Sequence, residues 1–370
     1  MNESVAASGS VVLAGGGTAG HTSPLIATGL ELRRLSPELT LTALGTARGL
    51  ETTVVPAAGL DLELIPPVPM PRRIGKDLAL VGPRLVEAVR ATVRLLRRTE
   101  ADVVLGFGGY VSTPAYLAAR RLGLPIVIHE QNVLPGLANR LAARLTRHVY
   151  TSFPKTELPH ARCIGLPIRR AITDLDRAAL RREACTGFEL HPELRTLLVS
   201  GGSQGAQQIN TAVVGAKHEL LAQGIQVLHV LGPKNLTPGI ERTVHERTGA
   251  VYQPVAYVAQ MERAYAAADL MLGRSGASTV LETAAVRLPA VFVPYPHGNG
   301  EQALNAELVV NAGGGIMLAD SDCTSAWVAE EIPALFAHPD RLAGMSKALA
   351  DVARLDAATV LASRVLEVIR

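Results

Sequence analysis

Short runs of aliphatic and β-branched residues alternate along the chain with stretches whose apolar residues recur at helical spacing. The run 11–14 precedes a helical stretch opened by Pro24, and the run 196–200 precedes another over residues 207–221. Strands separated by helices in this way predict βα units, which build parallel sheets covered by helices on both faces. The hydrophobic pattern therefore predicts an α/β protein.

The order strand, glycine-rich loop, helix occurs in each half of the chain, which predicts two similar domains. The length of 370 residues agrees with this, at roughly 150 residues per domain. The segment 152–169 contains three prolines and is typical of a linker. We expect domains over 1–169 and 170–350, with a C-terminal helix near 351–370 packing back on the first domain.

Composition excludes several classes of protein. With 48% hydrophobic and 19% charged residues, the chain is too apolar to be largely disordered. A net charge of +3 and 4% aromatic residues give no footprint for nucleic acid, so no nucleic-acid partner is expected. The three cysteines lie far apart, which favours free thiols. No stretch approaches the ~18 apolar residues of a spanning helix, and we expect a cytoplasmic protein.

Glycine-rich segments follow strands at 15–20, 106–109, 201–206 and 313–315. Glycine lets backbone amides approach anionic oxygens, and a helix N-terminus adds roughly half a positive elementary charge. The repeated loops indicate a phosphate-rich ligand at the carboxyl ends of the strands, in a cleft between the domains. The alternative is that the glycines serve only tight turns and close helix packing.

Two other interpretations account for one loop each. Residues 15–20 fit the dinucleotide pattern GxGxxG, but the next strand, 39–44, lacks the acidic residue that holds a ribose, although Arg48 would suit NADP. Residues 201–205 fit a nucleophile elbow with Ser203, followed by Asp269 and His297 in triad order. Neither explains the remaining glycine loops.

Six motifs, taken together and in order, carry a resemblance to one enzyme family. They are GGGTAGH (15–21), GFGGYVSTP (106–114), HEQN (129–132), GGSQGA (201–206), RSGASTVLE (274–282) and PHGNGEQALNA (296–306). The family they resemble is MurG, the bacterial UDP-N-acetylglucosamine transferases that complete lipid II. The resemblance implies a two-domain GT-B fold whose C-terminal half binds UDP-N-acetylglucosamine. Its N-terminal half would receive lipid I, the lipid-linked muramyl pentapeptide, and the reaction would invert the anomeric carbon.

The resemblance also implies site residues. For the acceptor diphosphate these are Gly16, Gly17, Gly108, Gly109 and Tyr110. For the donor they are Thr18, Gly20, Asn132, Arg169, Ser203, Gln204, Val258, Ser275, Glu282, Gln302 and Asn305. Glu282 would bind the ribose hydroxyls, and Gln302 and Asn305 the sugar hydroxyls. The chain departs from the family at Arg287, which stands where relatives commonly have glycine.

An inverting transfer needs a base for the acceptor hydroxyl and stabilisation of the departing diphosphate. His21 is one candidate, because it lies at a helix N-terminus and its unperturbed pKa of roughly 6.5 suits neutral proton transfer. Glu130, after the strand 126–128, is the other. His21 could instead cap the helix or bind phosphate, and Glu130 could fix a loop. Arg169 and the helix after Gly205 would stabilise the leaving group.

No metal or other cofactor is expected. Two DxD pairs, 174/176 and 320/322, each precede a helix and fit N-terminal capping better than metal binding. We therefore expect full activity in chelator.

A membrane patch is expected because lipid I stays in the bilayer. Apolar residues ringed by cations suit an anionic lipid surface, to which each basic residue contributes about 1 kcal/mol. The patch comprises Val68, Met70, Arg72, Arg73, Ile74, Lys76, Leu78 and Val81. The alternative is an ordinary helix that packs on the sheet. The expected location is peripheral, on the cytoplasmic side of the cell membrane, with other cell-wall synthesis proteins as possible partners.

Three alternative functions remain at this point: a GT-B transferase with another acceptor, a UDP-N-acetylglucosamine 2-epimerase, and a membrane scaffold without activity.

Overall fold

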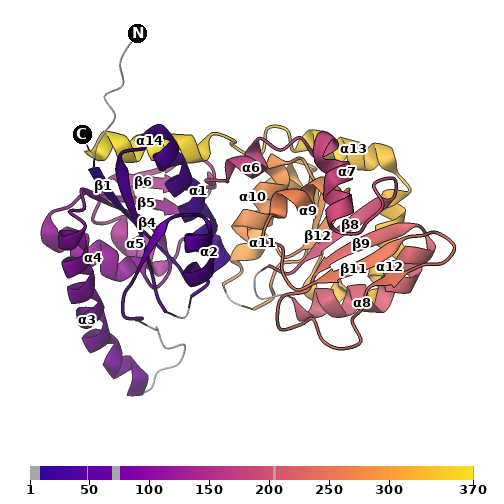
Figure 1. Cartoon of the computed structure of the whole chain (residues 1–370), viewed down its shortest axis with the longest axis horizontal. Helices are drawn as coiled ribbons and strands as arrows, with labels where there is room; N and C mark the ends of the chain where they lie inside the picture. Colours follow the sequence, from indigo (N-terminus) through magenta and orange to yellow (C-terminus); the bar gives the residue numbers. More distant parts are fainter. Residues whose placement is uncertain (1–8, 48, 69–75, 203–205, 298, 370) are drawn as a thin grey trace, which may run out of the picture. The chain divides into compact units, whose positions relative to one another are not determined.

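The computed structural model describes residues 9–47, 49–68, 76–202, 206–297 and 299–369, with only the backbone of 76–80. The chain forms two compact units, one of Met1–Arg169 with Arg354–Arg370 and one of Arg170–Ala353. Each unit contains a seven-stranded sheet (Figure 1). The prediction of an α/β fold with two parallel-sheet domains is confirmed.

The sheet of the first unit is entirely parallel, in the order β3-β2-β1-β4-β5-β6-β7. Its strands are β1 (Gly9–Gly15), β2 (Leu39–Gly45), β3 (Asp61–Leu64), β4 (Val103–Gly108), β5 (Ile126–Glu130), β6 (His148–Thr151) and β7 (Ala161–Cys163). Strands are added toward β3 on one side of β1 and toward β7 on the other. The order reverses between β1 and β4, and such a switch point is where open α/β sheets bind ligands.

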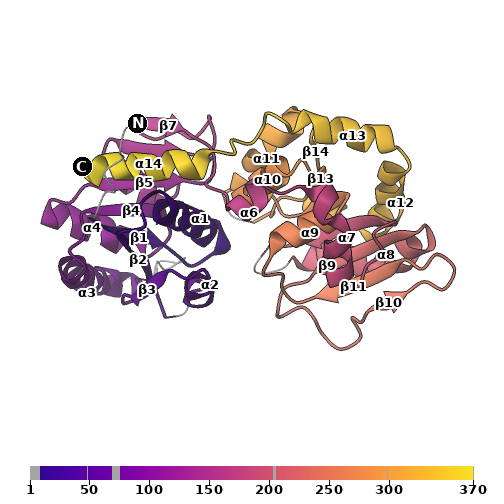
Figure 2. The ribbon, with the colours of Figure 1, turned by 45° about the horizontal axis from the view of Figure 1, so that its top comes forward.

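Helices cover both faces of this sheet (Figure 2). They are α1 (Ala19–Leu35), α2 (Glu51–Ala57), α3 (Lys76–Arg98), α4 (Ser112–Leu122), α5 (Leu137–Ala142) and the C-terminal α14 (Ala357–Ile369). Successive β1 side chains point to opposite faces. Leu13 packs in one core with Leu25 of α1 and Leu361 of α14, whereas Val12 packs in another with Leu96 of α3 and Tyr116 of α4.

The C-terminal helix belongs to the first unit. It lies beside α1 in both ribbon views (Figures 1 and 2). Thr359 Oγ1 donates a 2.7 Å hydrogen bond to the buried carboxylate of Glu31 on α1. The last helix thus completes the helical layer over β1.

The sheet of the second unit has the order β10-β11-β9-β8-β12-β13-β14, and only β10 is antiparallel to its neighbour. Its strands are β8 (Arg195–Ser200), β9 (Ile225–Val230), β10 (Thr243–Val244), β11 (Val251–Val255), β12 (Leu270–Gly273), β13 (Ala290–Phe292) and β14 (Gly315–Met317). The order reverses between β8 and β12, so the loops after these strands mark the switch point.

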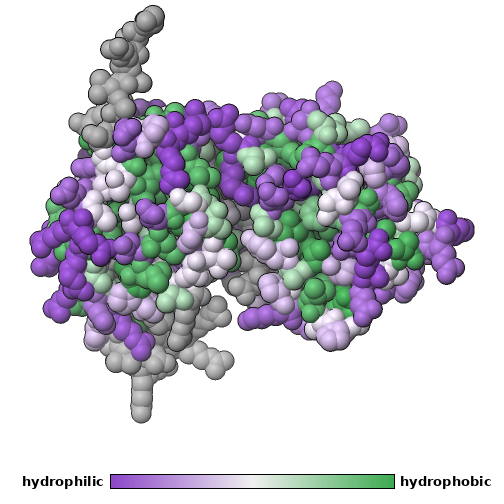
Figure 3. Space-filling model, in the orientation of Figure 1, coloured by the Kyte–Doolittle hydropathy of each residue, from purple (hydrophilic) through white to green (hydrophobic). Residues whose placement is uncertain are grey.

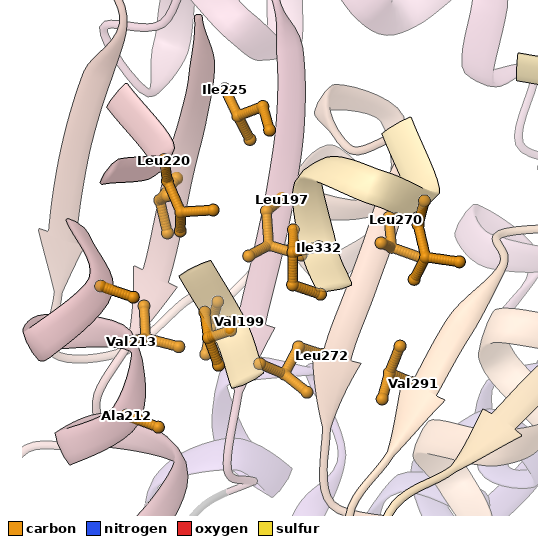
Figure 4. Packing of buried hydrophobic residues seen from close by; sticks show 14 of the residues in the cluster. Leu197, Val199, Ala212, Val213, Leu220, Ile225, Leu270, Leu272, Val291 and Ile332 are labelled. Carbon is orange, nitrogen blue, oxygen red and sulfur yellow. The ribbon is translucent and has the colours of Figure 1, made fainter. Parts of the chain in front are cut away.

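The helices of the second unit are α6 (Arg170–Thr173), α7 (Arg177–Gly187), α8 (Gln207–Ala222), α9 (Met261–Ala267), α10 (Ala277–Ala285), α11 (Glu301–Asn311), η1 (Asp320–Asp322), α12 (Ser325–Phe336) and α13 (Pro339–Ala348). Figure 4 shows Leu197 and Leu272 of the strands in one core with Val213 of α8 and Ile332 of α12. This apolar layer fixes the strands whose ends carry the site loops.

Two local features bear on the sequence analysis, the start of α1 and the backbone conformation of Arg287. Pro24 does not open α1, which begins at Ala19; the proline removes only the bond that its own N–H would have made to the carbonyl of residue 20. His21 therefore lies in the first turn. Arg287 has φ +53°, a left-handed conformation that costs a non-glycine residue roughly 1–2 kcal/mol, and this agrees with the glycine that the resemblance implies at this position.

No helix in the described part of the chain is both long and apolar enough to cross a bilayer.

Candidate functional site

In the first unit, the glycine loops after β1 and β4 touch each other. Gly108 and Gly109 have φ of +86° and +81°. A Cβ atom on Gly109 would lie 2.5 Å from the Gly16 carbonyl oxygen and 3.2 Å from His21 Cδ2, and one on Gly108 would lie 3.4 Å from His21 Cε1. Only glycine permits this approach. Residues predicted from two separate motifs thus meet around the His21 imidazole, at the switch point.

Two side chains hold these loops. Ser112 Oγ lies 2.8 Å from the Ala14 carbonyl oxygen and 2.7 Å from that of Gly108, so it ties the ends of β1 and β4 together. The buried carboxylate of Glu51, at the start of α2, accepts 2.9 Å hydrogen bonds from the N–H groups of Gly17 and Thr46. The Gly17 amide is therefore engaged inside the unit, and the first turn of α1 presents the remaining amides of the loop.

Sequence reasoning missed Glu51. The available signal was an acidic residue at the start of what the structure shows to be a short helix, but that signal usually means only a favourable interaction with the helix dipole.

The HEQN motif also contacts the His21 imidazole. His21 Nδ1 lies 3.0 Å from Gln131 Oε1. Gln131 is 1% exposed, and its Nε2 lies 2.8 Å from the His129 carbonyl oxygen and 3.2 Å from His129 Nδ1. His129 Nε2 lies 2.9 Å from the Gly165 carbonyl oxygen. Gln131 was not predicted, because nothing in its spacing indicates a contact 110 residues away.

Glu130 is committed to its own loop. It is 2% exposed, it is the last residue of β5, and its carboxylate accepts hydrogen bonds from the N–H of Asn132 (3.0 Å), the N–H of Gly136 (3.0 Å) and Asn139 Nδ2 (2.9 Å). Asn139 is held in turn by Tyr116, whose hydroxyl donates to Asn139 Oδ1 at 2.7 Å. The geometry favours the loop-fixing role over the role of base. His21, by contrast, is only partly buried.

Burial of His129 predicts a loss of stability in acid. Removal from water lowers the pKa of this imidazole to about 4, whereas its unfolded value is roughly 6.5. Between these two pKa values the His129 imidazole is protonated in the unfolded chain and neutral in the folded chain. The free energy of unfolding therefore falls as the pH falls through this range. The loss between pH 7 and pH 4.5 attributable to His129 is about 2–3 kcal/mol.

Urea unfolding at these two pH values measures that loss. His129→Gln should show a difference between them smaller by that amount, whereas the control His148→Gln, at an exposed position, should keep it. An unchanged difference in His129→Gln would contradict the assignment.

In the second unit, four predicted donor residues lie on the segments that follow β12 and β13. Ser275 follows β12 and is buried, with no hydrogen-bond partner for Oγ among the described residues. Glu282, on α10, accepts a 2.8 Å hydrogen bond from Tyr265. Gln302 Oε1 accepts from the Tyr295 N–H at 3.0 Å, and Asn305 is buried on the same helix, α11, which packs against α10. These four residues lie on two neighbouring helices or the loop before one of them.

The other predicted donor residues are distributed differently. Val258 is buried in the second unit. Thr18, Gly20, Asn132 and Arg169 belong to the first unit. Ser203, Gln204 and Arg48 lie outside the described residues.

Arg274 anchors the segment that leads into α11. It is buried, and its Nη1 lies 3.1 Å from each of the Val293 and Pro294 carbonyl oxygens and 2.6 Å from Asp320 Oδ1. Its guanidinium also lies 5.5 Å from the centre of the Tyr295 ring, within range of a cation–π interaction. Sequence reasoning assigned this arginine no role.

The capping predictions have mixed outcomes. Asp176 caps α7, because its side chain accepts from the Ala179 N–H at 3.0 Å, as predicted. The capping role predicted for the pair 320/322 is wrong, since Thr324 caps α12 and Asp320 pairs with Arg274. Among the described residues, no group of three or more His, Cys, Asp or Glu is arranged to hold a metal ion.

The hydrolase interpretation gains no support from Asp269. This residue precedes β12, accepts a 2.8 Å hydrogen bond from the Thr196 N–H near the start of β8, and pairs with Arg181 at 3.0 Å. The carboxyl end of β8, at Ser200, lies four residues or about 13 Å further along the strand from Thr196. Ser203 itself lies outside the described residues.

The membrane patch is wrong at Val68, which is 6% exposed and therefore part of the packed interior. Val81 is half-buried. Met70, Arg72, Arg73 and Ile74, and the side chains of Lys76 and Leu78, lie outside the described residues. Figure 3 shows hydrophilic residues gathered over α3 and α4. Among the side chains of α3 that the structure describes, the exposed cations are Arg90, Arg94, Arg97 and Arg98.

Comparison with known proteins agrees with this geometry. The glycosyltransferase family 28 N-terminal domain matches residues 11–151, and the family 28 C-terminal domain matches residues 196–361. The chain is 55% identical over 360 residues to the UDP-N-acetylglucosamine--N-acetylmuramyl-(pentapeptide) pyrophosphoryl-undecaprenol N-acetylglucosamine transferase of Nocardioides sp., covering 96% of this chain and 97% of that protein. It is 57% identical over 320 residues to the protein of the same name from Cutibacterium acnes, covering 84% and 85%.

The crystal structure of Acinetobacter baumannii MurG matches with a TM-score of 0.72 at 24% identity, covering 97% of this chain and 99% of that one, which shows the shared fold. With these matches over nearly its full length, the chain belongs to glycosyltransferase family 28 and, within it, to the MurG family.

Proposed function

We propose that the protein transfers N-acetylglucosamine from UDP-N-acetylglucosamine to the 4-hydroxyl of lipid I, undecaprenyl-pyrophosphoryl-N-acetylmuramyl-pentapeptide. The product is lipid II, the disaccharide precursor of peptidoglycan. The observation that carries this proposal is the 55% identity, over 96% of the chain, to a transferase named for this reaction. The meeting of the glycine loops at His21 supports it, because it supplies an anion site and a base in one unit.

The second unit binds the nucleotide sugar in this proposal. Glu282 accepts the ribose hydroxyls, and its hydrogen bond from Tyr265 fixes the orientation of its carboxylate. Gln302 and Asn305 hold the sugar hydroxyls from α11, whose entry segment Arg274 secures. Ser275 supplies a buried hydroxyl at the switch point. Arg169 and the N-terminus of α8 stabilise the diphosphate as it leaves.

The first unit binds the acceptor. Backbone amides at the first turn of α1 and at Gly108–Tyr110 suit the polyprenyl diphosphate, since N–H groups at a helix start carry partial positive charge. Tyr110 is 54% exposed and is available to the ligand.

His21 acts as the general base. It removes the proton of the muramyl 4-hydroxyl while that oxygen attacks the anomeric carbon and the bond from that carbon to UDP breaks with inversion. The proton remains on His21, and UDP leaves as the anion. Glu130 is less suited to this step, because both of its oxygens accept N–H groups of its loop, and a proton on either oxygen would place an O–H group against one of these donors.

The proposed reaction uses no bound metal ion. Helix N-termini, backbone amides and Arg169 supply the positive charge that a divalent ion would otherwise bring to the diphosphate. We expect the rate of transfer in excess EDTA to equal the rate with added Mg²⁺. A strict requirement for Mg²⁺ would refute this part of the proposal.

The enzyme works at the membrane surface in this proposal, because its acceptor is anchored there. The exposed arginines of α3 suit the cytoplasmic leaflet, whose anionic lipids attract basic segments.

Transfer of radiolabelled N-acetylglucosamine to a short-chain lipid I analogue tests the function. The expected result is labelled lipid product and UDP release that depends on added acceptor. Conversion of the nucleotide sugar to its 2-epimer without acceptor would instead identify an epimerase, and label on a different lipid would identify another acceptor.

A further inference from the structure

Four groups of the first unit form a continuous hydrogen-bonded chain that ends at His21. It runs from the Gly165 carbonyl oxygen to His129 (2.9 Å), from His129 to Gln131 (3.2 Å) and from Gln131 to His21 (3.0 Å). His129 and Gln131 are buried, so water does not compete for the first two contacts, while the third joins buried Gln131 to partly buried His21. The donor and the acceptor at each step follow from the chemistry of the atoms.

The direction of the chain is set first at Gly165. A carbonyl oxygen only accepts hydrogen bonds, so His129 Nε2 must carry a hydrogen. Burial keeps this imidazole neutral by lowering its pKa to about 4. A neutral imidazole has one N–H, and His129 Nδ1 is therefore a lone-pair acceptor.

A second carbonyl sets the direction at Gln131. Its Nε2 lies 2.8 Å from the His129 carbonyl oxygen, which only accepts, so the amide nitrogen of Gln131 must face His129 and its oxygen must face His21. The other N–H of this amide then meets the lone pair of His129 Nδ1, which agrees with the first step. The two carbonyl groups give the same orientation independently.

The last step reaches His21. Gln131 Oε1 only accepts, so His21 Nδ1 must donate to it. In the neutral imidazole the proton then sits on Nδ1 and the lone pair on Nε2. The described residues include no hydrogen-bond partner for His21 Nε2, and the carbon atoms beside it face Gly108 and Gly109 of the second glycine loop.

We propose that Gln131 is a positioning residue that, oriented by His129 and Gly165, holds His21 as the Nδ1–H tautomer and so makes Nε2 the nitrogen that takes the acceptor proton. This inference rests on the proposed function for the role of His21, but the tautomer itself does not. Because the acceptor at Nδ1 is a neutral amide and not a carboxylate, Gln131 fixes the tautomer and ring orientation without adding a negative charge beside the base.

The tautomers are measurable directly in the full-length protein. Long-range ¹H–¹⁵N spectra of ¹⁵N-histidine-labelled protein near pH 8 separate the two neutral forms. The signals of the two residues are assigned from His21→Gln and His129→Gln. We expect opposite tautomers, Nδ1–H at His21 and Nε2–H at His129. An Nε2–H tautomer at His21 in the unmodified protein would overturn the proposal without any variant of Gln131.

Two substitutions separate hydrogen bonding from packing. Gln131→Met keeps the length of the side chain and removes its acceptor and its donors. Gln131→Glu keeps an acceptor oxygen toward His21 and loses the N–H groups that Gln131 offers to His129. A general base contributes about 10²–10⁴-fold to rate, and we expect Gln131→Met to lose about tenfold or more of this in kcat, with KM for the nucleotide sugar unchanged. The Nδ1–H tautomer should be lost in Gln131→Met and kept in Gln131→Glu, which should turn over faster. Gln223→Met, at an exposed glutamine of the second unit, is the matched control and should change neither property.

The outcomes distinguish this inference from the proposed function. Equal kcat in Gln131→Met and Gln131→Glu with an unchanged His21 tautomer would overturn the positioning role. Normal turnover in His21→Gln would overturn the assignment of the base, even where the spectra show the expected tautomers. Absence of transfer to the lipid I analogue in the unmodified protein would overturn the function.

Discussion

His21→Gln is expected to lower kcat for transfer to a lipid I analogue by about 10²–10⁴-fold, the contribution of a general base. The glutamine side chain can still donate a hydrogen bond near the glycine loops, but it has no lone pair basic enough to accept the 4-hydroxyl proton. KM for UDP-N-acetylglucosamine should change little, because Glu282, Gln302 and Asn305, proposed to hold the ribose and sugar hydroxyls, lie in the second unit, and the substitution leaves Thr18 and Gly20 in place. Steady-state kinetics at saturating acceptor measures both constants.

Glu130→Gln is the informative comparison, since Glu130 is the rival base. In either orientation its amide would place an N–H group against a donor, that of Asn132 or those of Gly136 and Asn139, so we expect the free energy of unfolding to fall by about 1–3 kcal/mol. At a temperature where the variant remains folded, kcat should stay well above that of His21→Gln. The opposite ranking, with His21→Gln active and folded Glu130→Gln inactive, would make Glu130 the base. His148→Gln, at an exposed position in the same unit, should behave as the unmodified protein.

The sequence predicts the framework of the molecule because the framework depends on local patterns. The period of two along β1 places Val12 and Leu13 in different cores. The glycine loops after β1 and β4 are predicted as a ligand site from the sequence, whereas the strand order that makes them the switch point comes from the structure. Asp176 is recognised as a cap because its bond reaches only three residues ahead.

The features that sequence reasoning missed depend on contacts between distant residues. Gln131 meets His21 across 110 positions, and Glu51 meets Gly17 across 34. Asp320 pairs with Arg274, 46 residues away, and does not cap α12, because Thr324 is better placed to cap that helix. Val68 fails as a membrane contact for the same reason, since tertiary packing decides its burial and the hydropathy of its neighbours does not.

Gly109→Ala is expected to lower both stability and activity, because Gly109 lies where the two glycine loops touch. The new methyl group would lie 2.5 Å from the Gly16 carbonyl oxygen, closer than atoms can approach, and the neighbour is backbone that cannot rotate away. The φ of +81° adds the left-handed cost of roughly 1–2 kcal/mol for a residue with a Cβ. Because the loops must separate, we expect the free energy of unfolding to fall by about 3 kcal/mol or more, within the range for strained and overpacked sites.

Activity should fall with it, because His21 Cδ2 is only 3.2 Å from the same methyl position. A shift of about 1 Å in a catalytic group can cost 10²-fold in rate, so kcat should drop by at least about tenfold in protein that is still folded.

Gly123→Ala is the matched control. Gly123 ends α4 with φ +72° and has nothing within 4 Å of the new methyl group, so this variant carries the left-handed cost alone. The free energy of unfolding in urea should therefore be lower in Gly109→Ala than in Gly123→Ala by about 1–2 kcal/mol or more, and kcat should be lower by at least about tenfold. If the two variants matched in both measurements, the loops would have room between them, and the close approach that places the anion site beside His21 would be wrong.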